Sequence, residues 1–109
     1  FDAVSIRVPS IAGSLSLISA LVEKEVFKDE VNDIFKKAAE EPRWSKVLKV
    51  SEDELVSTDI IGEPYGAVID LAMTKVVDGN LVSVFSWYDN EAGYTATLVE
   101  HVKRIAVNL

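Results

Sequence analysis

The apolar residues in the first half of this 109-residue chain follow the two-residue spacing of a strand in some segments and the spacing of a helix in another. Residues 3–8 and 14–23 alternate or are rich in β-branched residues, which predicts two strands, the first ending at Pro9. Toward the end of 14–23 both strand faces are apolar, as in a sheet covered on both sides. Residues 28–40 have apolar positions at helical spacing, with acidic residues at the start, so a surface amphipathic helix is predicted there.

The second half of the chain reads mainly as sheet. Four extended segments are predicted at 44–50, 56–61, 67–77 and 81–87. An Asp-Gly pair in residues 78–80 indicates a hairpin between the last two, and from Asn90 the spacing becomes helical again, with Asp89 as N-cap. This order predicts an α+β fold: an antiparallel or mixed sheet covered by helices on one face, with a C-terminal helix.

Composition narrows the class of protein. The size suits one domain, and half the residues are apolar without any run long enough to span a bilayer, so a soluble globular chain is expected. A net charge of −7 argues against nucleic acid or an anionic membrane as partner. The chain has no cysteine, which suits a reducing compartment such as the cytoplasm. It begins with Phe1 and shows no signal peptide, so further sequence is expected upstream.

The segment SWYDNEAGYT, residues 86–95, contains the best candidate chemistry. It lies where a strand is predicted to end and a helix to begin, so unpaired backbone donors and the Asn90 amide could converge on a ligand. Gly93 would allow close backbone approach, and Tyr88 and Tyr94 could form flat walls. A purely structural interpretation, with Asp89 capping the helix and the aromatic residues packing, explains the same residues. The residues alone favour that structural interpretation.

Two motifs resemble one enzyme family. Residues 86–94, SWYDNEAGY, resemble the S-W-Y-D-N-E-x-G-Y signature of glyceraldehyde-3-phosphate dehydrogenases, and residues 6–10, IRVPS, look like that family's R-V-P-T segment. The segments between them follow the family's order, so the resemblance covers essentially the whole chain. It implies that residues 1–89 are the C-terminal part of the catalytic domain, which binds substrate and phosphate, and that residues 90–109 are the terminal helix.

The resemblance also implies a function in glycolysis. The full enzyme would oxidise an aldehyde phosphate to an acyl phosphate with NAD and inorganic phosphate, with NADP as the alternative cofactor. The family's catalytic cysteine and histidine lie upstream of the R-V-P segment, so no catalytic residue is expected in this chain, which would be inactive alone. The family further implies a cytoplasmic homo-oligomer, a tetramer.

Four residues carry over from the family by position. Arg7 matches the arginine that binds phosphate, and a guanidinium suits a tetrahedral oxyanion. Asn90 matches the asparagine that bonds the nicotinamide carboxamide, and Tyr94 matches the tyrosine beside the nicotinamide ring. Tyr88 matches a site-adjacent tyrosine near the catalytic pair. No metal site is expected, because residues 52–54 read as a solvated turn, and His101 is expected at the surface or an interface.

Several positions depart from the family pattern. Ser10 stands where threonine is usual and Ile11 where proline is common, Ala92 stands where the family has an aromatic residue, and residues 65–67 replace a more polar stretch. Lys46 and Lys49 lie where the family tends to have glycines. These departures leave open the close relative erythrose-4-phosphate dehydrogenase, and also a non-catalytic scaffold or assembly module, natural or engineered. Sequence upstream of Phe1 would separate enzyme from module.

The terminal helix raises a packing question. In the family this helix packs onto the nucleotide-binding domain, so Leu98, Val102 and Ile105 would lack that cover here. We expect the helix either to dock on the chain's own sheet or to bury its apolar face against another chain.

Overall fold

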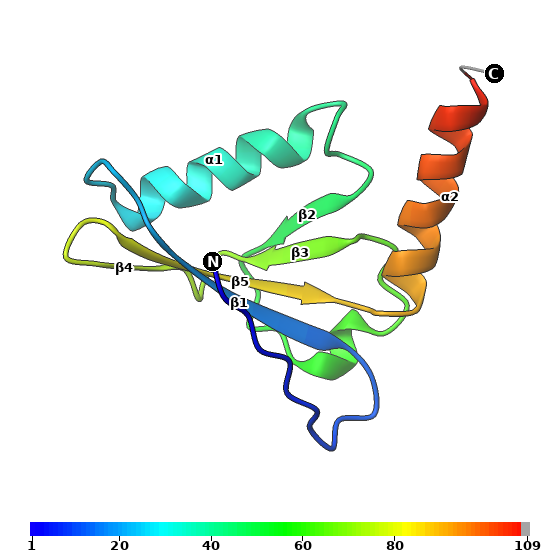
Figure 1. The fold of residues 1–109 in the computed structure, drawn as a ribbon, viewed down its shortest axis with the longest axis horizontal. Helices are drawn as coiled ribbons and strands as arrows, with labels where there is room; N and C mark the ends of the chain where they lie inside the picture. The colour runs from blue at the N-terminus through cyan, green and yellow to red at the C-terminus, as the bar shows by residue number, and fades with distance from the viewer. Residues whose placement is uncertain (108–109) are drawn as a thin grey trace.

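The chain forms a mixed sheet with one helix on a face and a second helix at one end, as the sequence predicts (Figure 1). A computed structural model describes residues 1–107. The elements in chain order are β1 (Ser14–Leu21), α1 (Lys28–Glu40), β2 (Leu48–Ser51), the 3₁₀ helix η1 (Ser57–Ile60), β3 (Ala67–Asp70), β4 (Lys75–Val77), β5 (Leu81–Tyr88) and α2 (Ala92–Ala106). The last two residues of the predicted terminal helix, 108–109, lie outside the described residues.

Strand β5 organises the sheet, whose order is β1-β5-β3-β2, with β4 also paired to β5. It runs antiparallel to β1 over eight residue pairs, from Ser14 with Tyr88 to Leu21 with Leu81. Strands β3 and β4 pair with β5 antiparallel, whereas β2 and β3 are parallel. The sheet is therefore mixed. The strands β1, β3 and β4 are all held in it by hydrogen bonds to β5.

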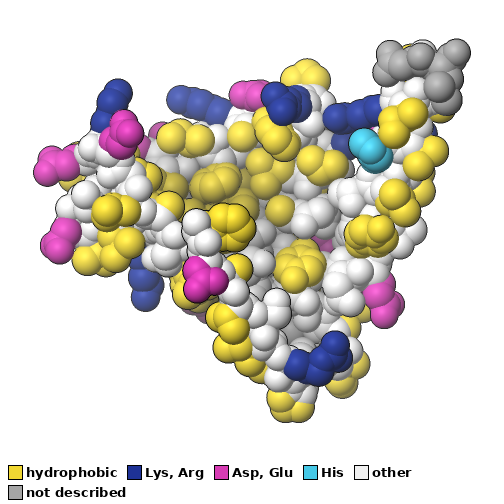
Figure 2. Space-filling view, in the orientation of Figure 1, with side chains coloured by type: hydrophobic (Ala, Val, Ile, Leu, Met, Phe, Trp, Pro, Cys, Tyr) yellow, Lys and Arg dark blue, Asp and Glu magenta, His cyan; other side chains and the backbone are white. Residues whose placement is uncertain are grey.

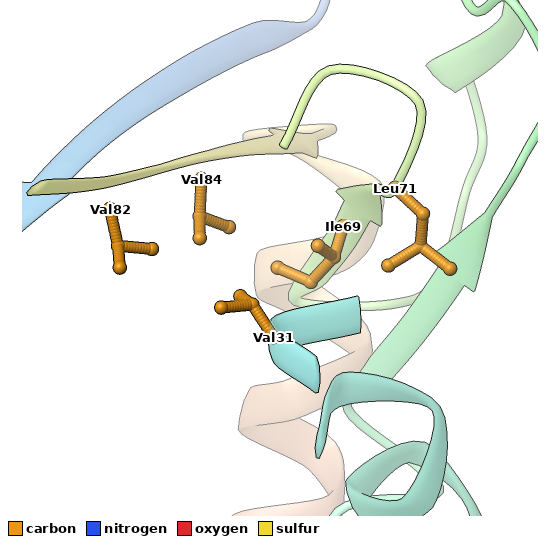
Figure 3. Close-up of a cluster of buried hydrophobic side chains, with 5 residues drawn as sticks. All are labelled: Val31, Ile69, Leu71, Val82 and Val84. Atoms are coloured by element: carbon orange, nitrogen blue, oxygen red, sulfur yellow. The ribbon is translucent and has the colours of Figure 1, made fainter. Parts of the chain in front are cut away.

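The core lies between α1 and the middle of the sheet. Figure 3 shows Val31 of α1 facing side chains that come from β3, β5 and the residue after β3. The buried cluster comprises Val31, Ile69, Leu71, Val82 and Val84. On β5 the buried residues alternate with more exposed ones, because successive side chains of a strand point to opposite faces. The apolar face of the helix at residues 28–40 thus packs against the apolar face of the strand at residues 81–87.

The predicted hairpin is confirmed between β4 and β5. Asp78 and Gly79 both have positive φ, 50° and 74°, and the Asn80 N–H donates to the Val77 carbonyl at 3.3 Å. Two consecutive positive φ values define a type I′ turn, whose twist matches that of the strands. The Asp-Gly pair is the local sequence that adopts this turn at low cost.

The strand predicted for residues 3–8 is wrong, since β1 is the first strand in the described residues. Val4, Ile6 and Val8 are all exposed, and residues 1–8 join no ladder. The β-branched residues there favour a strand only where a neighbouring strand supplies hydrogen bonds and a packing surface. Within residues 1–107 they have neither.

Three other predicted strands need correction. The strand predicted at 56–61 is replaced by η1, residues 57–60, because the Asp59 carboxylate accepts the Val56 N–H at 2.8 Å and stabilises a turn of 3₁₀ helix. Residues 67–77 are two strands rather than one, interrupted where the Asp70 carboxylate accepts the Met73 N–H at 3.2 Å. Residues 44–47 are turns, so the predicted strand 44–50 shrinks to β2. In each case local hydrogen bonds prevail over the apolar, β-branched composition.

Strand β1 does not have the two covered faces that its sequence predicts. Leu17 and Ile18, which point to opposite faces, are 60% and 53% exposed. Helix α1 packs over β2, β3 and β5 and leaves β1 at the sheet edge. Apolar surface on both sides of this strand therefore remains in contact with solvent in the described chain.

Helix α2 extends away from the sheet after its first turn (Figure 1). Leu98, Val102 and Ile105 are 45%, 56% and 48% exposed, and Figure 2 shows hydrophobic side chains along the outer edge of this helix. Docking on the chain's own sheet, one of the two expected outcomes, does not occur. No helix within residues 1–107 combines the length and apolar character needed to cross a membrane.

Replacing Leu71, which is 2% exposed, by alanine tests the core. We expect Leu71→Ala to lower the free energy of unfolding by about 2–5 kcal/mol, because it leaves a cavity between α1 and the sheet. Urea denaturation measures this change. The matched control Ile34→Ala, at a 64% exposed position of α1, should change the stability by well under half as much. Equal losses for the two variants would contradict the assignment of the core.

Candidate functional site

The corner between β5 and α2 is built around the buried carboxylate of Asp89, which is 7% exposed. Its Oδ1 accepts the N–H groups of Glu91 at 2.8 Å and Ala92 at 3.0 Å, and the Gly93 N–H donates to its carbonyl at 3.0 Å. A side chain that accepts the second and third following amides is an N-cap, so the predicted capping role of Asp89 is confirmed. Regular helix begins three residues later, at Ala92.

The other oxygen of Asp89 reaches a distant loop. Its Oδ2 accepts the Gly62 N–H at 2.8 Å, and Gly62 belongs to residues 61–66, which connect η1 to β3. We call residues 61–66 the bracing loop. One carboxylate therefore joins the start of α2 to a loop 27 residues away in sequence.

These hydrogen bonds lower the pKa of the Asp89 carboxyl. The backbone N–H of Gly62, followed by those of Glu91 and Ala92, favours the ionised form and holds the pKa of this carboxyl below its ordinary value of 3.8, while burial opposes the shift. The group is thus ionised whenever the corner is intact near neutral pH. Its negative charge also lies at the helix end that favours an anion.

Glycine at position 93 allows α2 to approach the bracing loop. A Cβ atom there would overlap the carbonyl oxygen of Tyr65. A Cβ at Gly66 would come within 2.9 Å of the Thr97 methyl group. The loop and the first two turns of α2 therefore pack closely, backbone against backbone at Gly93 and backbone against side chain at Gly66, and larger residues at these two positions would separate them.

Ion pairs attach the loop and α2 separately to β2 and the turn that precedes it. Lys49 of β2 donates to Glu63 at 2.9 Å and lies 5.7 Å from the ring centroid of Tyr65, which attaches the bracing loop to β2. On the other side, Glu100 of α2 accepts from Lys46 at 2.9 Å, and together with the neighbouring Lys103 this pairing lowers the pKa of the Glu100 carboxyl. An open groove runs between α2 and the loop, with Gly62, Tyr65, Ala92 and Val99 among its lining residues.

Three of the four predicted site residues belong to this corner. Tyr88 ends β5 and is half-buried, Asn90 is exposed directly after Asp89, and Tyr94 is 64% exposed in the first turn of α2. Neither the donor nor the acceptor of the Asn90 side chain forms a hydrogen bond within residues 1–107. The amide is therefore available to a ligand that offers a matching acceptor and donor, as a carboxamide does.

Arg7 lies in the irregular segment before β1 and is exposed. That segment leads to Ser14, which pairs with Tyr88, so it enters the sheet beside the corner. Its guanidinium forms no hydrogen bond or ion pair with the rest of residues 1–107. The charge is unneutralised by protein carboxylates in the described chain, which leaves it available to an anion.

The sequence does not predict the role of the bracing loop, because its link to Asp89 is long-range. A local signal is Gly62, which has a φ of +81° and directly follows the extended segment predicted at 56–61. His101 and residues 52–54 are exposed. Within residues 1–107 no three His, Cys, Asp or Glu side chains gather as a potential metal site.

Comparison with known proteins identifies the class to which this corner belongs. Residues 1–90 match the family described as glyceraldehyde 3-phosphate dehydrogenase, C-terminal domain, and the chain belongs to that family. The family resemblance that the sequence suggested is thereby confirmed.

Individual relatives are dehydrogenases of several bacteria. The chain is 46% identical over 99 residues to glyceraldehyde-3-phosphate dehydrogenase 2 of Streptomyces avermitilis, covering 91% of this chain and 29% of the relative. It is 38% identical over 108 residues to the Mycobacterium avium glyceraldehyde-3-phosphate dehydrogenase, covering 99% of this chain and 31% of the relative. It is 35% identical over 105 residues to that of Borreliella burgdorferi, covering 95% of this chain and 31% of the relative. The chain thus spans about 30% of the length of these relatives.

The close approach at Gly93 gives a direct test of the packing. Helix propensity alone would make Gly93→Ala stabilising by about 1 kcal/mol. We expect the opposite, a loss of about 1–3 kcal/mol in the free energy of unfolding, because the new methyl group overlaps the Tyr65 carbonyl. Thermal or urea denaturation measures the sign. Thr95→Ala, at an exposed position in the same turn, is the control and should not destabilise to this extent.

The stability that Asp89 contributes should depend on pH. Because its pKa is lower in the folded chain than the ordinary value of 3.8, the contribution is fully present above 3.8 and is lost as pH falls through the folded-state pKa. We expect Asp89→Asn to be less stable than the wild-type protein at neutral pH, with the difference shrinking on acidification through this range. Urea unfolding at a series of pH values measures it. A difference that stayed constant with pH would contradict the ionised, hydrogen-bonded carboxylate.

Proposed function

We propose that this chain is the phosphate- and nicotinamide-facing part of an NAD-dependent, phosphorylating glyceraldehyde-3-phosphate dehydrogenase. The family match over residues 1–90 is the observation that carries the proposal. In the full-length protein, an aldehyde phosphate would be oxidised to an acyl phosphate with uptake of inorganic phosphate. The catalytic cysteine and histidine would come from the remainder of that protein, since this chain has no cysteine and its single histidine lies on α2.

The cofactor assignment rests on the chemistry of the corner. The Asn90 amide is exposed and has no hydrogen-bond partner in residues 1–107, and the preceding residue, Asp89, is buried. These properties suit a side chain that binds a carboxamide. NAD, when bound, would supply the hydride acceptor. Asn90 would bind the nicotinamide carboxamide and so select which ring face meets the substrate, while exposed Tyr94 would limit movement of the ring. Tyr88, half-buried at the end of β5, would close the site on the side of the catalytic pair.

Arg7 is proposed to bind phosphate. Its unpaired guanidinium offers parallel N–H donors to a tetrahedral oxyanion, and its charge would lower the energy of an incoming phosphate or of a phosphorylated substrate. The segment that carries it is irregular in the described chain and enters the sheet beside Tyr88. This placement is compatible with a phosphate held near the corner.

The full-length protein is further proposed to be a cytoplasmic homo-oligomer, a tetramer as in the family. The apolar surfaces left exposed on β1 and α2 support burial against other parts of such an assembly.

Replacing Arg7 in the full-length enzyme tests the proposal. We expect Arg7→Ala to raise the KM for inorganic phosphate about 10- to 100-fold, the loss expected for a charge-assisted hydrogen-bonded contact, measured by steady-state kinetics. Arg43→Ala is the matched control, because Arg43 is an exposed arginine that stacks on Trp44 away from the corner. Unchanged phosphate dependence in Arg7→Ala would refute the role of Arg7, and absence of any dehydrogenase activity in the wild-type protein would favour a scaffold.

A further inference from the structure

Asp89 uses its two carboxylate oxygens for different purposes. Oδ1 caps α2 through the amides of Glu91 and Ala92, whereas Oδ2 binds the amide of Gly62 in the bracing loop. Capping alone requires only the first oxygen. The second contact gives this side chain a connection that a helix cap does not need, and Asn90 is the next residue in the chain.

We propose that Asp89 is a positioning residue, which fixes the direction of the Asn90 amide by tying the backbone around it to the bracing loop. This inference rests on the proposed function, in which Asn90 binds the carboxamide of the nicotinamide. Asp89 itself is buried and acts through Asn90, without touching the cofactor.

The backbone is the feature through which Asn90 can be held. Its side chain is exposed and forms no hydrogen bond within residues 1–107, so no neighbouring side chain there orients it. The amides of the three residues after Asn90 all donate to Asp89, two to the carboxylate and one to the carbonyl. Asp89 therefore holds the backbone on both sides of Asn90. The direction in which that backbone presents the Asn90 side chain depends on the bond between Asp89 and the bracing loop.

The bracing loop, to which Asp89 binds, is itself attached to the sheet. Lys49 of β2 pairs with Glu63 and lies over Tyr65, so both sides of the bracing loop contact one strand. Gly93 lies against the Tyr65 carbonyl, so the first turn of α2 packs closely on the loop. A ligand that binds Asn90 therefore meets an amide whose backbone is already ordered, which reduces the entropy lost on binding.

A variant that separates the two oxygens can distinguish positioning from capping. In Asp89→Ser the hydroxyl still suits an N-cap, because serine is a favoured capping residue. Its shorter side chain cannot also reach Gly62, so the link to the bracing loop is lost. The matched control is Asp59→Ser, which removes another hydrogen bond of this kind, the one that the Val56 N–H donates to the Asp59 carboxylate at the start of η1.

The experiment uses the full-length enzyme and titrates NAD by isothermal calorimetry into four proteins: wild type, Asp89→Ser, Asn90→Ala and the double variant. We expect Asp89→Ser to raise the dissociation constant of NAD about 3- to 10-fold, the effect of losing the preorganisation of one side chain. In a protein that already carries Asn90→Ala, the Asp89→Ser change should raise the dissociation constant of NAD little further, because the effect of Asp89 passes through Asn90. Asp59→Ser should leave the dissociation constant unchanged.

Amide hydrogen exchange supplies a readout that does not involve the cofactor. In Asp89→Ser the Gly62 amide should exchange faster, while the Ala92 amide stays protected by the serine cap. Slow exchange at Gly62 in the variant would overturn the link between Asp89 and the loop. If Asp89→Ser does not fold, Asp89→Asn, which keeps the side-chain volume and turns one acceptor into a donor, takes its place in the NAD cycle with the same expectation.

The outcomes separate this inference from the function on which it rests. If Asn90→Ala leaves NAD binding unchanged, the proposed cofactor role of Asn90 fails, and the positioning role with it. If Asn90→Ala weakens NAD binding but Asp89→Ser does not, the function stands and the role of Asp89 is wrong. Equal, additive losses in both backgrounds would show that Asp89 stabilises the corner without acting through Asn90.

Discussion

The pairing of β5 with three other strands is the constraint on which the rest of the structure depends. Its alternating residues put Val82 and Val84 against α1, and its register with β1 puts Ser14 beside Tyr88. Because a shift of one residue would exchange the two faces of the strand, this register fixes both the core and the end of β5 together. Asp89 follows immediately, so the position of the candidate site is inherited from the sheet.

The elements that the sequence predicted correctly are those with a strong local signal. Helix α1 has the predicted bounds, residues 28–40, because its apolar stripe, acidic start and following Pro42 all agree. The Asp-Gly hairpin and β5 were also recognisable, since each gives a clear signal in residues that are neighbours in the sequence. The errors have a different origin. Asp59 and Asp70 bind nearby backbone amides and interrupt apparent strands, while residues 3–8 alternate correctly but find no strand partner in the described chain.

The candidate site was predictable to the same degree. Asp89 as a cap, and Asn90 and Tyr94 on the following turn, follow from a strand that ends where a helix begins. The contact between Asp89 and Gly62 joins residues 27 positions apart, and no periodicity or turn motif encodes it. The contact of Lys49 with Tyr65 and Glu63 is likewise visible only in three dimensions, because it joins β2 to the bracing loop across more than ten residues of sequence.

The attachment of α2 has a consequence for how the chain unfolds. Its first turns contact the bracing loop through Asp89 and Gly93. Farther along, Lys46 and Arg104 make contacts at the surface, but the apolar stripe of Leu98, Val102 and Ile105 stays half-exposed and has little packing within residues 1–107. A helix of 15 residues is marginal in water without such packing. We therefore expect two units of unequal stability, a sheet with α1 and a helix whose C-terminal turns open at lower cost while the sheet stays folded.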